Sequence, residues 1–251
     1  MSHRSGDHVF EELRPSRQTT RPLLAIVTAL AVLSPGAAGA DNPQARAVEA
    51  ASPGVEAAAI HQAVTAARLA AWGRKAADAQ ALILAARMLA EIPFRSADFA
   101  AEPGAAAAPG TPSDAPAFTV AGLLDEAETL ARGDGQTLAE IEAVRAAAAR
   151  GVANSPFGQG PILARRDVQA RQTYWFEADA KGGEILRVAA IGDGDTDIDM
   201  VVRGADGRVL CEDGAYDHFP VCTLTPGEDQ RLRVEIINRG AVWTRVRILS
   251  N

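Results

Sequence analysis

The sequence predicts an α+β multidomain protein in which Ala-rich helical hairpins are followed by an antiparallel β-sandwich or jelly roll. Two observations carry this prediction. Ala supplies 53 of the 251 residues, chiefly between positions 45 and 150, where apolar residues recur at helical spacing. Beyond residue 160, short runs of alternating β-branched, aromatic and polar residues are separated by turn signals. We therefore expect helices first and strands second.

Residues 1–40 have the organisation of a secretory signal peptide. Arginines precede the apolar run 23–33, and a Ser-Pro-Gly breaker and Ala38-Gly39-Ala40 follow it. A run of 11 residues is too short to span a bilayer, which takes about 20. A permanent membrane anchor is the alternative. We expect cleavage before Asp41, a periplasmic or secreted mature protein, and no membrane span after cleavage.

Residues 41–92 are predicted to form the first helical hairpin. Ser52-Pro53 is a suitable helix start, and apolar residues then recur at helical spacing. Gly73 is expected to end the first helix and Asp78 to cap the second. Five prolines in residues 93–117 predict a linker or long loop there.

Residues 118–150 are predicted to form the second hairpin, with its turn at Gly133-Asp134-Gly135. The two hairpins can close into a four-helix unit that resembles a pair of tetratricopeptide-type repeats. The alternative is an Ala-rich bundle without a binding groove.

Residues 163–251 follow a second predicted linker, 151–162, and are predicted to form the sandwich. Alternation with a period of two recurs in the runs 174–177, 198–202, 232–236 and 242–248. Turn signals separate these runs every 10 to 20 residues. Short alternating strands at this spacing are typical of an antiparallel sandwich.

Within this region, four segments carry a family resemblance. They are Gly182-Gly183-Glu184, the run from Val188 to Val202, Ala205-Asp206-Gly207 and Asp213. Through them, residues 168–251 resemble the bacterial pre-peptidase C-terminal (PPC) domain, whose usual signature is a D-T-D-L-D-L-x-V strand followed by D-x-x-G. Ile198 and Met200 depart from that signature. The resemblance implies a small β-sandwich, found on secreted peptidases and on exported proteins of no known activity, that in some cases binds calcium.

An acidic run lies between residues 193 and 217, with eight acids against two bases. A hard cation with oxygen ligands relieves such repulsion, which suits Ca²⁺. The spacing is not that of a helical calcium loop, so the site would form between loops. The alternative is that Asp197 and Asp199 hydrogen-bond backbone amides while the other acids are solvated. The candidate calcium ligands are Asp193, Asp195, Asp197, Asp199, Asp213 and Asp217.

Cys211 and Cys222 are the two cysteines, and both follow the predicted export signal. Lying within one predicted hairpin, they are expected to form a disulfide that closes the loop Asp213–Phe219. A redox pair is the alternative, although a catalytic dithiol usually has two intervening residues.

Composition and motifs limit the function. A net charge of −7 disfavours nucleic acid as a partner, because nucleic acid requires basic patches. No catalytic residue is predicted, since His61 and His218 fall in different predicted domains and the common nucleophile and metalloprotease motifs are absent from the sequence.

We therefore expect an exported, non-catalytic protein. Its helices would form an interaction or spacer region, and its sandwich would bind a protein or polysaccharide partner. Ca²⁺ is the sole cofactor predicted. The alternative is an accessory or peptidase-associated secreted protein with an unrecognised enzymatic site.

Overall fold

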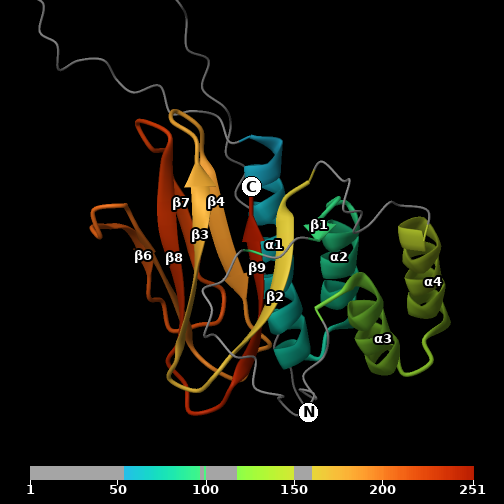
Figure 1. The fold of residues 1–251 in the computed structure, drawn as a ribbon. Helices are drawn as coiled ribbons and strands as arrows, with labels where there is room; N and C mark the ends of the chain where they lie inside the picture. The colour runs from blue at the N-terminus through green and yellow to red at the C-terminus, as the bar shows by residue number, and fades with distance from the viewer. Residues whose placement is uncertain (1–53, 97–98, 100–117, 150–159) are drawn as a thin grey trace, which may run out of the picture. The chain divides into compact units, whose positions relative to one another are not determined.

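The protein is described from a computed structural model over residues 54–96, 99, 118–149 and 160–251. These ranges hold helices α1–α4 and two β-sheets, which confirms the α+β class with a β-sandwich-like C-terminal region (Figure 1). They lie in one compact unit, Val48–Asn251. The predicted signal peptide and most of both predicted linkers lie outside the described residues. No described helix is both long and apolar enough to cross a membrane.

The first hairpin consists of α1 (Val55–Ala76) and α2 (Ala79–Ala90). The predicted cap on α2 is confirmed, because the carboxylate of Asp78 accepts hydrogen bonds from two first-turn amides. Ser52-Pro53 lies outside the described residues, and Gly54 is the residue that precedes α1.

The prediction that Gly73 ends the first helix is wrong. Helix α1 continues through Gly73 and ends before Ala77, which has a left-handed backbone with φ of 53°. A Cβ atom on Gly73 would lie 2.9 Å from the Cβ of Ala81. Glycine is therefore required here for the close approach of α1 and α2, and not for a turn.

The second hairpin consists of α3 (Val120–Ala131) and α4 (Gly135–Ala149). The Oγ1 atom of Thr119 accepts a hydrogen bond of 3.1 Å from the Gly122 amide at the start of α3. In the predicted turn, a carboxylate oxygen of Asp134 accepts one of 2.9 Å from the Thr137 amide. Helix α3 packs against α2, so the two hairpins contact each other.

The strands form two sheets that pack face to face. Sheet A has the order β1-β2-β9-β4-β7, and sheet B has the order β3-β8-β5-β6. All strand pairs are antiparallel except β1 with β2. The strands are β1 (Arg95–Ser96), β2 (Ile162–Val168), β3 (Thr173–Ala180), β4 (Leu186–Ile191), β5 (Ile198–Arg203), β6 (Val209–Asp213), β7 (Val221–Leu224), β8 (Gln230–Asn238) and β9 (Thr244–Ser250). Strand β1 comes from residues of the predicted linker 93–117.

Two apolar cores lie on opposite faces of sheet A. The inter-sheet core, between the two sheets, is formed by inward side chains that include Phe176, Met200 and Leu232. The helix–sheet core joins buried side chains of α1–α4 to Ala189, Ile191, Phe219 and Leu249.

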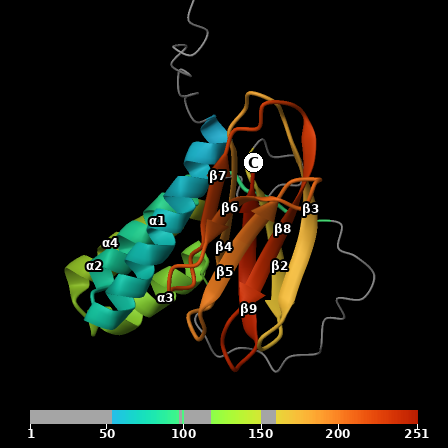
Figure 2. The same cartoon turned by 90° about the vertical axis from the view of Figure 1, so that its left-hand side faces the viewer.

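Helix α1 lies beside sheet A, where it contacts β4 (Figure 2). Strand β4 contributes Val188 and Ala190 to the inter-sheet core, and Ala189 and Ile191 to the helix–sheet core. Because β4 is buried on both faces, its sequence is nearly continuously apolar instead of alternating.

Candidate functional site

The first part of the acidic run lies on the loop between β4 and β5. One carboxylate oxygen of Asp193 accepts a hydrogen bond of 2.6 Å from Thr244 Oγ1, and the other accepts one of 3.1 Å from the Arg245 amide. Loss of hydration, together with a hydrogen bond to the Asp193 carboxyl, raises the pKa of Asp195 to about 6. Asp193 is thus hydrogen-bonded to the start of β9, and Asp195 holds a proton at mildly acidic pH.

The next two acids lie where β5 begins. The Arg239 Nε atom donates to a carboxylate oxygen of Asp199, which is largely buried. Loss of hydration and then the charge of Asp199 raise the pKa of Asp197. Among the described residues, the buried Oδ1 atom of Asp197 has no hydrogen-bond partner.

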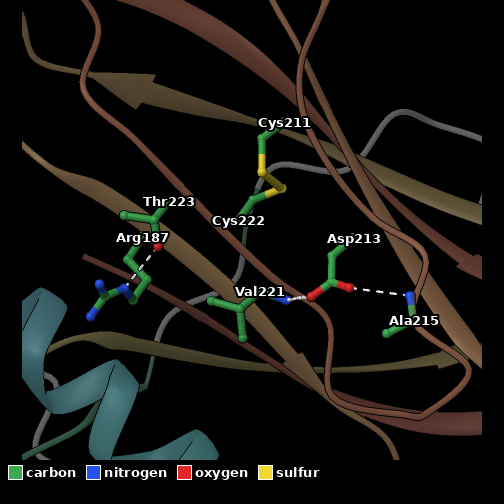
Figure 3. Close-up of a disulfide and its surroundings, with 7 residues drawn as sticks. All are labelled: Arg187, Cys211, Asp213, Ala215, Val221, Cys222 and Thr223. Carbon is green, nitrogen blue, oxygen red and sulfur yellow. Dashed lines mark hydrogen bonds between the residues drawn. A yellow bond between two sulfur atoms is a disulfide. The ribbon is translucent and has the colours of Figure 1, made fainter.

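The last two acids cap turns in the loop between β6 and β7. Asp213 accepts hydrogen bonds of 3.2 Å from the Ala215 amide and 2.8 Å from the Val221 amide (Figure 3). Asp217 accepts one of 2.7 Å from the Phe219 amide. These side chains hold the loop in shape by bonding its backbone.

The structure does not gather these acids around a common point. In the described ranges, no group of three or more His, Cys, Asp or Glu side chains is arranged to hold a metal ion. Several of the carboxylates instead bond backbone amides, a threonine or an arginine. Calcium binding therefore stays a prediction, with no support from this arrangement.

Cys211 and Cys222 form the predicted disulfide, with their Cα atoms 5.8 Å apart. The expectation that both lie in one hairpin is wrong. Cys211 lies on β6, which pairs with β5 in sheet B, whereas Cys222 lies on β7, which pairs with β4 in sheet A. Because β6 and β7 are the edge strands of their sheets, the disulfide links the two sheets along one open edge of the sandwich (Figure 3).

The segment between the two cysteines presents an exposed aromatic side chain. Tyr216 is 93% exposed, while Asp213 and Asp217 bond the backbone on either side of it. Arg68 of α1 donates a hydrogen bond of 3.2 Å to the Phe219 carbonyl. We call residues 211–222 the Tyr216 loop. Sequence reasoning missed Tyr216, although an aromatic residue between Gly214 and Asp217, in a loop closed by two cysteines, is the signal that could have drawn attention to it.

The two histidines within the described residues, His61 and His218, do not form a catalytic arrangement with each other. His218 packs against Phe219, with 3.8 Å between the ring centroids, and burial lowers its pKa. It is therefore neutral at pH 7. His61 lies on the exposed face of α1.

Comparisons with known proteins leave the family open. No protein-family model and no curated protein matches the sequence. Among solved structures, a periplasmic inhibitor of g-type lysozyme, PliG from Aeromonas hydrophila, is similar with a TM-score of 0.28 and 8% identity, covering 36% of this chain and 86% of that one. A de novo designed double-stranded β-helix is similar with a TM-score of 0.24 and 15% identity, covering 36% and 97%.

Proposed function

We propose that this is an exported, non-catalytic binding protein whose PPC-like sandwich holds a protein partner through the Tyr216 loop. Export is supported by the signal-like segment 1–40 and by the disulfide, since disulfides persist in oxidising compartments. The PPC assignment of residues 168–251 is supported by the acidic strand signature and by the two-sheet architecture.

The observation that carries the proposal is a fully exposed tyrosine on a constrained loop. Tyr216 is 93% exposed, which gives the monomer little stability, yet the disulfide and two carboxylates fix its surroundings. Tyrosine is enriched among residues that dominate binding energy, and a loop that is already ordered loses less entropy on association.

A protein partner is favoured over a polysaccharide because the ring of Trp175 is already in contact with an arginine. Trp175 on β3 could stack on a sugar ring, but the guanidinium of Arg233 lies 4.1 Å from its ring centroid. A sugar would have to displace this cation–π contact. Tyr216, in contrast, is accessible without rearrangement.

The test compares capture of a partner from periplasmic extract by the immobilised wild-type protein, Tyr216→Ala and Trp72→Ala. Trp72 is the matched control, because it is also aromatic and is 55% exposed on α1. We expect the wild type and Trp72→Ala to retain the same protein and Tyr216→Ala to lose it, with all three melting at the same temperature. Equal capture by Tyr216→Ala, or capture of polysaccharide alone, would contradict the proposal.

A further inference from the structure

A small cavity lies inside the helix–sheet core. Its volume is about 70 Å³, and its walls come from α1, the last turn of α2, the start of α3 and sheet A. The apolar part of the wall is formed by Leu89, Ile92, Phe94, Phe118, Ile191 and Leu249. A purely apolar cavity would stay dry and empty, because its lining would make no hydrogen bonds.

One wall of this cavity is a buried arginine. Arg247 on β9 is 8% exposed, and its Nε atom donates no hydrogen bond within the described part of the chain. Its guanidinium carbon lies 5.9 Å from the centroid of the Phe118 ring. Burial lowers the pKa of this guanidinium to about 10, so it is still charged at pH 7. The charge of Asp193 partly offsets this burial, but a buried donor without an acceptor still costs free energy.

A second arginine lies beside it. Arg165 on β2 is the direct cross-strand neighbour of Arg247, and it also lines the cavity. Arg165 is exposed, so its guanidinium is accessible both to solvent and to a ligand. Two like charges directly opposite each other on a sheet repel, so the pair would be stabilised by an anion placed between them and the apolar wall.

The start of α3 adds to this positive field. Thr119 and Val120 line the same cavity. Although Thr119 caps the Gly122 amide, the first turn of a helix keeps a partial positive charge. The cavity therefore combines a buried guanidinium whose Nε atom has no acceptor among the described residues, the guanidinium of the exposed Arg165 and a helix N-terminus with an apolar wall.

We propose that this cavity binds a small monocarboxylate, with the carboxylate between Arg247 and Arg165 and a short aliphatic chain against the apolar wall. A planar guanidinium fits a carboxylate through paired hydrogen bonds, which explains why an arginine occupies this position. The volume of about 70 Å³ limits the chain, because an engineered cavity of roughly 150 Å³ holds benzene. A two- or three-carbon acid is the size that fits.

This inference goes beyond the proposed function, since the cavity shares no residue with the Tyr216 loop. Its test uses propionate as the probe and propionamide as the uncharged control of the same shape. Binding is followed by amide chemical shifts of cavity residues and by the melting temperature, at constant ionic strength. The proteins are the wild type, Arg247→Met, Arg165→Gln and Arg208→Met, the last being a control arginine with an 80% exposed side chain.

We expect propionate to give saturable shifts at the cavity and to raise the melting temperature, and propionamide to give neither. Arg247→Met should melt at or above the wild-type temperature, because it removes a buried charged group whose Nε atom lacks an acceptor, and should bind propionate about tenfold or more weakly. Arg165→Gln should weaken binding by several-fold while keeping the fold, and Arg208→Met should bind like the wild type.

Three results would overturn the proposal. The first is that the wild type shows no saturable shifts with propionate at up to about 50 millimolar. This concentration is roughly the weakest dissociation constant at which so small a ligand would still bind usefully. The second is equal binding of propionate and propionamide. The third is unchanged propionate affinity in Arg165→Gln and in Arg247→Met; if Arg247→Met does not fold, Arg165→Gln alone decides.

Discussion

The two cores on either side of sheet A differ in how they are filled. The inter-sheet core contains large side chains such as Phe176 and Met200. The helix–sheet core relies heavily on alanine, and it leaves a cavity of about 70 Å³ next to a buried arginine. The face of sheet A toward sheet B is filled by large side chains, whereas the face toward the helices has a cavity and a buried charged side chain. The second face is therefore the better place to look for a ligand.

A matched pair of leucines tests this difference most directly. Leu232 is 0% exposed in the inter-sheet core, whereas Leu89 is 8% exposed and lines the cavity. We expect Leu232→Ala to lower the free energy of unfolding by about 4 kcal/mol and Leu89→Ala by about 2 kcal/mol, because Leu89 already lacks neighbours on one side. Denaturant unfolding measures both. Equal losses would mean that the two cores are equally well packed.

Removing the disulfide should affect the sheet edges more than the helices. The variant carrying both Cys211→Ser and Cys222→Ser is expected to lose about 3 kcal/mol of stability, because the closed loop spans about 12 residues. Since the bond links the edges of the two sheets, hydrogen exchange should accelerate in β6 and β7 more than in α1 and α2. Reducing the wild type provides the control. A uniform loss of protection would show that the edge is not the weak point.

The smallest expected effect is a pH dependence of stability that arises from Asp195, on the loop between β4 and β5. Because the pKa of Asp195 is raised to about 6 from its ordinary value of 3.8, the folded protein binds this proton more tightly than the unfolded chain does. Its contribution to stability is therefore present at low pH and is lost as pH rises from about 4 to about 6.

The wild type should accordingly gain melting temperature relative to Asp195→Asn as pH falls through this window, since asparagine cannot ionise. Glu212→Gln is the control, because Glu212 is exposed on β6. Thermal melts between pH 4 and pH 7 measure the difference. Parallel curves for the wild type and Asp195→Asn would contradict the shift.

Local patterns predicted much of this fold. Alternation in 174–177 predicted a strand within β3, and the carboxylate of Asp78 predicted the start of α2. Gly73 misled because glycine serves helix ends and close helix contacts equally well, and only the position of Ala81 decides between them. The cysteine pairing followed from composition and compartment, but its position across two sheets depended on long-range strand pairing.

The candidate sites were harder to predict, for a physical reason. Arg247 alternates with the buried Val246 and Ile248, so its position predicts a solvent-exposed side chain. It is buried because helices far away in the sequence cover that face of sheet A. The acidic run was conspicuous by charge, yet charge alone does not reveal that several of its carboxylates already bond backbone and side-chain donors.

Strand β4 also bears on whether the sandwich can be transplanted. If residues 160–251 were joined to another protein, Ala189, Ile191 and Leu249 would face water where α1 and its neighbours now lie. Such a patch would promote aggregation or recruit a substitute covering. A sandwich built around this strand is thus not a portable unit, and it can be exchanged between proteins only together with a layer that shields its second face.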